Sequence, residues 1–175
     1  MRIIAGSLGA RAFQSPKGSR THPMSDKVRG AIFNMLGDVT GLHVLDAFAG
    51  SGALCYEAVS RGAATAIGVD SDSNATLTMK RNIAGLALKN RVKAIRANVS
   101  SWSDNNPDQT FDIVLCDPPY DQLQLATIQK LIRHIAANGV LVISWPGSQP
   151  LPQFEGLWLV ADKNYGDSQV GMYKY

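Results

Sequence analysis

The order of hydrophobic and polar positions changes character at residue 42. From there on, short apolar runs alternate with amphipathic segments of helical length. The apolar runs predict strands at 44–45, 65–69, 92–96, 113–116, 140–144, 157–161 and 169–174. Helices are predicted at 53–61, 73–85 and 123–136. This alternation indicates an α/β fold with a mostly parallel sheet and helices on both faces. The last two strands have no helix between them, which predicts an antiparallel hairpin at one edge.

The segment before residue 42 has a different pattern. Two short apolar runs flank Gly6-Ser7-Leu8-Gly9, which predicts a small β-hairpin. Residues 15–24 contain two prolines and a glycine and are expected to form an irregular loop. Ser25 is a suitable N-cap for a helix that ends at Gly37. We therefore expect a basic hairpin and loop over residues 1–24, followed by one α/β domain over residues 25–175.

Composition narrows the class of protein. The chain has 175 residues, of which 45% are hydrophobic, enough for the core of a single domain. Cys55 and Cys116 both lie among apolar residues and are expected to be small core residues rather than a disulfide. No apolar stretch approaches the ~20 residues of a membrane span, and no signal peptide is recognisable. These features predict a cytoplasmic protein that does not bind membranes.

Positive charge is unevenly distributed. Within residues 1–30, six Lys and Arg residues stand against Asp26 alone, a charge of +5, so the other 145 residues sum to 3 − 5 = −2. A second basic cluster, without any acid, extends from Lys80 to Arg96. Such clusters suit a polyanion such as RNA, although each is also compatible with an ordinary solvated surface.

The first candidate site is the turn after the strand at 44–45, which reads Asp46-Ala47-Phe48-Ala49-Gly50-Ser51-Gly52. Glycines between a strand and a helix let the backbone approach a ligand closely. A dinucleotide-binding turn would need a third glycine where this chain has Cys55. An acid at the end of the strand suits a cationic ligand better, such as the amino-acid part of S-adenosylmethionine. A tight turn without a ligand is the alternative.

A second acid ends the next predicted strand. Asp70 follows Asp46 by 24 residues, and strand ends at this edge of an open sheet face the ligand crevice. A carboxylate there can accept the two ribose hydroxyls of a nucleoside. A ribose is common to S-adenosylmethionine and NAD, so Asp70 does not separate these cofactors. Asn98, after the third strand, is a candidate partner for an adenine ring or a plain turn residue.

The most specific motif is Asp117-Pro118-Pro119-Tyr120, directly after the strand at 113–116. Two prolines remove two backbone donors and stiffen the loop, so its carbonyls are available as acceptors. An exocyclic amine of a base is a poor nucleophile because its lone pair is delocalised into the ring. Asp117 and a neighbouring carbonyl can accept its N–H groups and favour a pyramidal, reactive nitrogen. Tyr120 can stack on the base.

The histidines do not suggest further chemistry. His22, His43 and His134 are scattered along the chain and indicate neither a metal site nor a catalytic base, and His134 is expected on the polar side of its helix. Ser51 has no partner that would make it a nucleophile. We therefore predict an enzyme without a metal.

Together these motifs resemble the class I, Rossmann-like S-adenosylmethionine methyltransferases, and Asp117–Tyr120 resembles their amino-methylating branch. The whole chain is similar to the RsmD family, which methylates N2 of a guanine in bacterial small-subunit ribosomal RNA. The matching segments are Arg2–Gly6, Ser25–Arg29, Ala31–Asn34 and Ala47–Gly52. The resemblance implies a seven-stranded sheet whose last strand is antiparallel. We also expect a monomer that acts on small-subunit ribosomal RNA or its assembled particle.

The resemblance assigns roles to individual residues. The residues implied to bind S-adenosyl-L-methionine are Asp46, Ala47, Phe48, Gly50, Gly52, Asp70, Ser71 and Asn98. Those implied to hold the target base are Asp117, Pro118, Pro119 and Tyr120. Those expected to contact RNA are Arg11, Arg20, Lys27 and Arg29.

The chain departs from the family pattern mainly on the substrate side. It has His22-Pro23-Met24 where the family has Arg-Pro-Thr, Gly30 where the family has an acid, and Asn98 where it has Asp. The alternatives to consider are therefore other substrates: adenine N6 in DNA, a protein glutamine or a small molecule. Few residues remain for a module that reads duplex grooves, which disfavours DNA. An RNA-binding protein without catalysis would not need the Asp117–Tyr120 loop.

Overall fold

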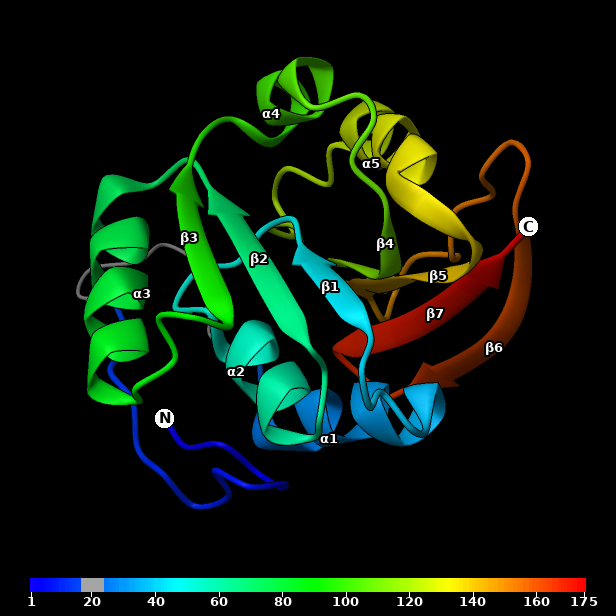
Figure 1. Ribbon diagram of the computed structural model, residues 1–175. Coiled ribbons are helices and arrows are strands. Elements are labelled where there is room, and N and C mark those ends of the chain that lie inside the picture. The colour runs from blue at the N-terminus through cyan, green and yellow to red at the C-terminus, as the bar shows by residue number, and fades with distance from the viewer. Residues whose placement is uncertain (17–23) are drawn as a thin grey trace.

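The computed structural model describes residues 1–16 and 24–175, and a seven-stranded sheet forms its centre (Figure 1). The strands are β1 (His43–Asp46), β2 (Thr65–Asp70), β3 (Val92–Arg96), β4 (Phe111–Cys116), β5 (Ile135–Pro146), β6 (Trp158–Asn164) and β7 (Ser168–Lys174). Their order is β3-β2-β1-β4-β5-β7-β6, and β7 runs antiparallel to both neighbours. The predicted parallel sheet with a terminal antiparallel hairpin is confirmed.

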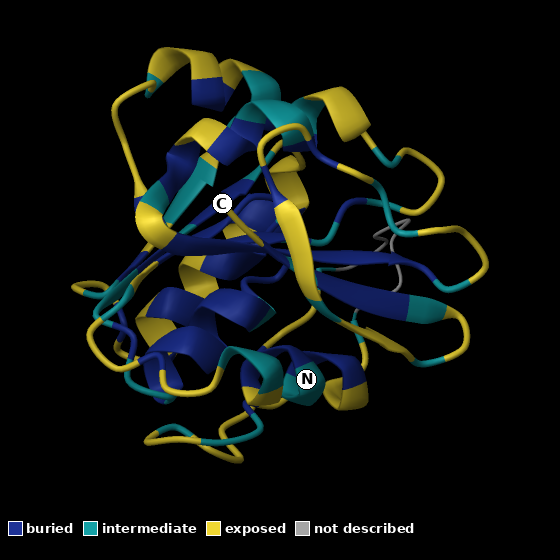
Figure 2. Cartoon of the chain, turned by 90° about the vertical axis from the view of Figure 1, so that its right-hand side faces the viewer, coloured by how far each residue is buried: buried dark blue, intermediate teal, exposed yellow. Residues whose placement is uncertain are grey.

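Helices cover both faces of this sheet. They are α1 (Asp26–Leu36), α2 (Ala53–Ser60), α3 (Ser73–Gly85), α4 (Val99–Asn105), α5 (Leu125–Leu131) and the 3₁₀ turn η1 (Ile132–His134). Apart from β6, alternate residues of the strands enter two separate cores, so that Val44 packs with α1, α2 and α3 while Leu45 packs with α4 and α5. The strands are therefore buried on both faces, as the dark sheet in Figure 2 shows, and β6 is the exposed edge. No described helix has the length and apolarity needed to cross a membrane.

Side-chain caps explain where several helices begin. The Ser25 hydroxyl accepts a hydrogen bond from the Val28 N–H at 3.2 Å, as the sequence predicts, and Gly37 with its positive φ of 74° ends the helix. Asp72 caps α3 through the N–H of Ala75 at 2.7 Å. The Asp72 cap lies in the turn after β2, and its N–H bonds the Asp70 carboxylate, so it also orients a residue of the site.

The sequence prediction is wrong around α5. We expected one helix over residues 123–136, whereas the helix ends at Leu131 and β5 already begins at Ile135, which pairs with Phe111. The apolar spacing of the segment is satisfied partly by the helix and partly by the strand. The helix α4 was not predicted. His134 is fully buried rather than on a polar face, because its ring bonds Ser103 Oγ at 2.8 Å and the Gln109 carbonyl at 2.6 Å.

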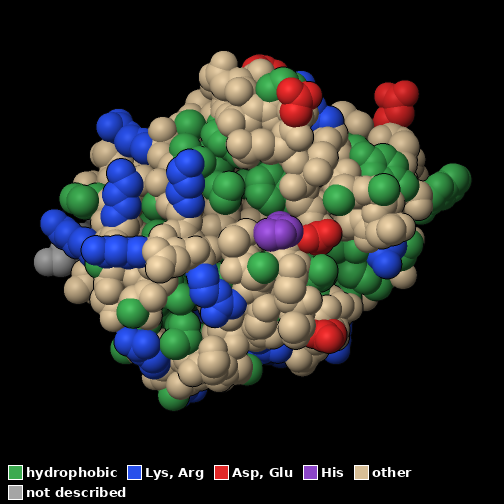
Figure 3. Space-filling view, viewed as in Figure 1, with side chains coloured by type: hydrophobic (Ala, Val, Ile, Leu, Met, Phe, Trp, Pro, Cys, Tyr) green, Lys and Arg blue, Asp and Glu red, His purple; other side chains and the backbone are tan. Residues whose placement is uncertain are grey.

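The surface charge is as uneven as the sequence. In Figure 3, Lys and Arg side chains gather over α3 and β3, whereas Asp and Glu side chains lie on other parts of this face. Five of the six cations between Lys80 and Arg96 are exposed on α3, on β3 or on the loop between them, whereas Arg91 is partly buried.

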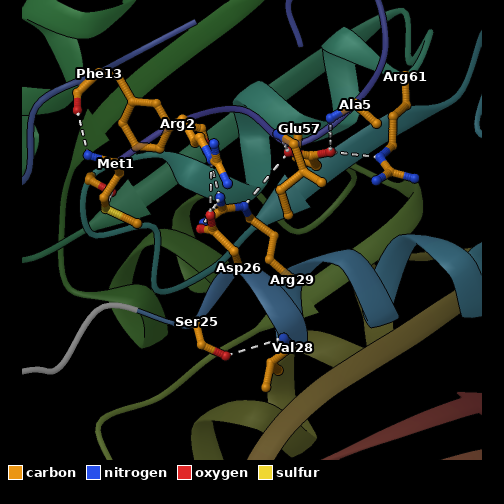
Figure 4. A network of polar contacts seen from close by, with 12 residues as sticks. Met1, Arg2, Ala5, Phe13, Ser25, Asp26, Val28, Arg29, Glu57 and Arg61 are labelled. Carbon is orange, nitrogen blue, oxygen red and sulfur yellow. Dashed lines mark hydrogen bonds and ion pairs between the residues drawn. The ribbon is translucent and has the colours of Figure 1, made fainter. Parts of the chain in front are cut away.

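The N-terminal segment packs onto the sheet domain rather than extending from it. Arg2 and Ala12 form one antiparallel bridge, so the predicted hairpin is present in reduced form. Ile3 and Phe13 are buried in the same core as α1 and α2. The Glu57 carboxylate on α2 accepts the backbone N–H groups of Ile4 at 2.8 Å and Ala5 at 3.1 Å, which fixes the segment in place (Figure 4).

The same carboxylate explains a correction to the predicted RNA contacts. The Arg29 side chain has no exposed surface, and it pairs with Asp26 at 2.8 Å and Glu57 at 3.7 Å (Figure 4). A buried cation of this kind is retained because it has partners. Arg29 is therefore a structural residue, and the prediction that it contacts RNA is wrong.

Candidate active site

A cavity of about 510 Å³ opens where the carboxyl ends of β1, β2 and β4 meet. Its wall contains the predicted residues Asp46, Phe48, Gly50, Asp70, Ser71, Asn98 and Asp117. These residues come from turns that are far apart in the sequence. The structure thus brings most of the predicted cofactor residues together in one place.

Two predicted residues support this cavity without lining it. Ala47 is fully buried, and its N–H bonds the Leu115 carbonyl at 2.9 Å. Gly52 caps α2 with a φ of 85°, and a Cβ added there would lie 2.5 Å from the Tyr56 hydroxyl. Both residues shape the turn, and glycine is required at position 52 for steric reasons.

Asp46 is the most unusual carboxylate of the site. It is 1% exposed, its Oδ1 has no hydrogen-bond partner, and its Oδ2 accepts only a long contact of 3.7 Å from the Cys55 thiol. Burial, with the nearby Asp117 and Asp70, raises its pKa to about 8. A buried acceptor without a partner lining a cavity is suited to a cationic ligand group, such as the ammonium of an amino acid.

Asp70 stands beside Asp46 in a different environment. One oxygen accepts the Gly50 N–H and the other accepts the Asp72 N–H, each at 2.8 Å. The carboxylate is thereby held rigidly at the rim of the cavity, and each oxygen keeps a lone pair for a ligand hydroxyl. Asn98 caps α4 by accepting the Ser101 N–H at 3.1 Å, which leaves its amide group available to a ligand. These donors and acceptors fit the sugar and base of a nucleoside.

A second cavity of about 620 Å³ lies on the other side of the Asp117–Tyr120 loop. Asp117 and Pro119 line both cavities, whereas Pro118 and Tyr120 line only the second. Burial raises the pKa of Asp117 to about 6, against the opposing effect of the Ser144 hydroxyl. The Tyr120 hydroxyl bonds Ser144 Oγ at 2.6 Å, which fixes the ring at the mouth of the cavity. The loop therefore separates two binding spaces and presents one carboxylate to both.

Sequence reasoning missed several lining residues. Met1 and Met24, together with Gln122 and Gln124, line the first cavity, and Ser144 and Tyr165 line the second. Met1 belongs to the N-terminal segment, which Glu57 of α2 holds in place, and Met24 lies directly before Ser25, the N-cap of α1. Ser144 lies near the carboxyl end of β5, next to β4, and it ends the strand predicted at 140–144; that position was the one available signal.

Besides Arg29, three residues are predicted to contact RNA, and the structure places them differently. Arg11 is exposed and donates to the Gly85 carbonyl at 3.2 Å, at the end of α3. Lys27 lines the second cavity. Arg20 lies outside the described residues. Within residues 1–16 and 24–175, no group of three or more His, Cys, Asp or Glu side chains is arranged to hold a metal ion.

The chain matches known proteins over its whole length. The model of a family described as conserved hypothetical protein 95 matches residues 1–174. A Bacillus subtilis protein named "Putative rRNA methyltransferase YlbH" is 34% identical over 99% of this chain and 98% of its own length. Ribosomal RNA small subunit methyltransferase D of Escherichia coli is 32% identical over 81% of this chain and 69% of its own.

Solved structures agree with these relatives. The structure titled "Putative methyltransferase yhhF from Escherichia coli" has a TM-score of 0.88 and 30% identity, and the match covers 99% of this chain and 96% of that one. A Thermus thermophilus protein of TM-score 0.80 and 27% identity covers 98% of both chains. The whole fold, including the N-terminal segment, is thus shared with these proteins.

Proposed function

On the premise that this chain belongs to the conserved hypothetical protein 95 family, we propose that it transfers the methyl group of S-adenosylmethionine to N2 of a guanine in small-subunit ribosomal RNA. Curated relatives are named as ribosomal RNA small subunit methyltransferase D. The chain is accordingly an S-adenosylmethionine-dependent rRNA methyltransferase, and the choice of guanine N2 is the finer part of the proposal.

One observation carries the proposal: two cavities meet at the Asp117 carboxylate. A methyl transfer needs a donor and an acceptor that approach each other in line, with little else for the protein to do than align them. The first cavity has acids at its strand ends, and the second is lined by Pro118, Pro119 and Tyr120. Of the residues that line both cavities, which are Met24, Asp117 and Pro119, only Asp117 has a carboxylate.

Different residues of the first cavity would bind different parts of the cofactor. S-Adenosylmethionine, when bound, supplies an electrophilic methyl group on a sulfonium. The unpartnered oxygen of Asp46 would receive the cationic amino-acid end, and Asp70 would accept the ribose hydroxyls. Asn98 and Phe48 would contact the adenine side. The Gly50 turn, held by its N–H bond to Asp70, lets the backbone approach closely.

The residues of the second cavity act on the target amine. Asp117 and a carbonyl of its proline loop would accept the two N–H groups, which moves the nitrogen lone pair out of conjugation and toward the methyl group. Tyr120, held by Ser144, would stack on the base. Lys27, on the wall of the same cavity, would contact the RNA near the target. Product formation releases one proton, for which the ionised Asp117 is the nearest acceptor.

Adenine N6 in DNA is the substrate with the most similar chemistry. The proline loop alone serves either amine, so the preference for ribosomal RNA rests on the relatives' names, and the choice of guanine N2 rests on the resemblance to the RsmD family. The proposal further includes a monomer in the cytoplasm that takes free ribosomal RNA or its assembled particle and needs no metal.

The test is transfer of labelled methyl from S-adenosylmethionine to bacterial small-subunit particles that lack native guanine-N2 methylation, followed by nucleoside analysis. Label in N2-methylguanosine is the expected result. Label in N6-methyladenine of a DNA control, with none in the RNA, would overturn the substrate and keep the cofactor. No label in either, with S-adenosylmethionine bound, would overturn the proposed reaction.

A further inference from the structure

The cations between Lys80 and Arg96 form a surface that the active site does not use. Five of them are exposed on α3, on β3 and on the loop between these elements: Lys80, Arg81, Lys89, Lys93 and Arg96. The sixth, Arg91, is structural, because its guanidinium donates to the Val59, Ala63 and Ala64 carbonyls. We call the five exposed residues the α3–β3 basic surface; it belongs to the part of Figure 3 where Lys and Arg side chains gather.

These five cations have no acidic partners among the described residues. No ion pair of the described chain includes any of them, and residues 73–97 contain no Asp or Glu at all. By contrast, Lys130 and Arg133 both pair with Asp104, at 2.8 and 2.9 Å. An arrangement that leaves like charges together destabilises the free protein slightly and favours a polyanionic partner.

The α3–β3 basic surface adjoins the cofactor cavity. Arg96 lies opposite Asp70 in the register of β2 and β3, and Ala75 of α3 lines the cavity five residues before Lys80. Three strand spacings separate β3 from β4, or about 14 Å at ~4.8 Å per spacing. At about 3.4 Å per nucleotide of a helical strand, a nucleic acid spans this distance in roughly four nucleotides. An RNA with its target base beside Asp117 can therefore extend to this surface.

The N-terminal segment continues the same surface. Arg11 is exposed, and its guanidinium reaches the Gly85 and Leu86 carbonyls at the end of α3. The hairpin that carries Arg11 therefore stands next to the basic cluster. Large apolar side chains, the usual anchors of a protein partner, are nearly missing here, since Leu77 is the one exposed on α3 and β3 in the described chain.

We infer that the α3–β3 basic surface binds phosphates of the substrate RNA at a distance of several nucleotides from the methylated base. The inference rests on the proposed function for the identity of the RNA. The surface contributes affinity and register without contacting the cofactor or the target amine. Binding of RNA phosphates to these cations releases counterions, so the contribution of the surface to RNA affinity decreases as the salt concentration rises.

The experiment measures binding of transcribed full-length small-subunit ribosomal RNA between 0.1 and 1 M monovalent salt. The test variant is Lys80→Gln/Lys93→Gln. The matched control is Lys130→Gln/Lys174→Gln, which removes the same charge elsewhere. Lys80, Lys93 and Lys174 are exposed, and the Lys130 side chain is 33% exposed, so both proteins are expected to fold. Their thermal transitions will check this.

The test variant should lower the slope of log K against log salt by about 1.4, at about 0.7 for each lost phosphate contact. If the binding curves converge near 1 M salt, that slope corresponds to roughly 25-fold weaker binding at 0.1 M. Methyl transfer should show a higher KM for RNA with kcat unchanged, and the control variant should behave like the wild type.

Three results would overturn the inference: an unchanged slope in the test variant, an equal loss in the control, or no RNA binding by the wild-type protein. Failure of the proposed function would look different. In that case the test variant would lose salt-dependent RNA binding relative to the control, while neither protein methylates the RNA, and the α3–β3 basic surface would stand as an RNA-binding surface.

Discussion

The buried Glu57 carboxylate offers a stringent test of how the N-terminal segment is held over the active site. It is fully buried and has four partners: two backbone N–H groups of the segment, Arg61 at 2.7 Å and the buried Arg29 at 3.7 Å (Figure 4). The change to examine is Glu57→Ala. It leaves the Arg29 guanidinium buried with only Asp26 as an acidic partner.

The expected cost follows from that geometry. Removing one partner of a buried ion pair typically destabilises a protein by about 3–5 kcal/mol, because the remaining charge is uncompensated. A domain of this size has about 5–15 kcal/mol of stability in total, so the variant should unfold at much lower urea concentration. Adding Arg29→Met should recover part of the loss, since the second change removes the buried charge.

The assay is urea denaturation of the wild type, Glu57→Ala, the double variant and Asp104→Ala. The last is a control because Asp104 also has two cationic partners but is half-exposed, so its loss should change the midpoint little. A Glu57→Ala midpoint equal to that of Asp104→Ala would refute the reasoning. A double variant Glu57→Ala/Arg29→Met that is clearly less stable than Glu57→Ala alone would also refute it.

Three further predictions concern the site. Asp70→Asn should weaken S-adenosylmethionine binding at least about tenfold, because the change removes a charged hydrogen-bond acceptor. Calorimetry measures the Kd, and an unchanged Kd would show that Asp70 does not bind the ribose. Since burial raises the pKa of Asp117 to about 6 and the ionised form accepts the amine protons, kcat/KM should rise from pH 5 to 7 with a midpoint near 6; a midpoint near 4 would contradict it. Gly52→Ala should destabilise the protein by at least about 1–3 kcal/mol. Gly85→Ala should not, because a Cβ at Gly85 meets open space and its φ is not positive. Thermal unfolding of the two variants compares these effects.

The sequence was most informative where chemistry coincides with a strand end. Asp46, Asp70 and Asp117 each follow a short apolar run, and parallel strands bring their carboxyl ends to one edge of the sheet. Their shared cavity could therefore be expected without coordinates. The helix–strand boundary near Ile135 could not, because apolar residues three or four apart satisfy either element until the pairing with Phe111 decides.

Charge was the least predictable property. Arg29 and Arg11 look alike in a basic stretch, yet one is buried against Glu57 and the other is exposed. A count of cations treats both as surface residues. The distinction depends on a tertiary contact between Arg29 of α1 and Glu57 of α2, which are 57 − 29 = 28 residues apart in the sequence. The same limit hid Met1 and Met24, because their places on the wall of the cofactor cavity depend on tertiary packing.

The most direct measurement is mass-spectrometric quantification of N2-methylguanosine in small-subunit ribosomal RNA after incubation with S-adenosylmethionine and either wild type, Asp117→Ala or Asp108→Ala. Asp108 is an exposed acid outside both cavities. We predict methylation by the wild type and Asp108→Ala. The methylation rate of Asp117→Ala should be at least about 10²-fold lower, as is found when a preplaced polar group is removed from an active site. This variant should still bind S-adenosylmethionine. Methylation by Asp117→Ala at the wild-type rate, or no N2-methylguanosine with any of the three proteins, would contradict the account.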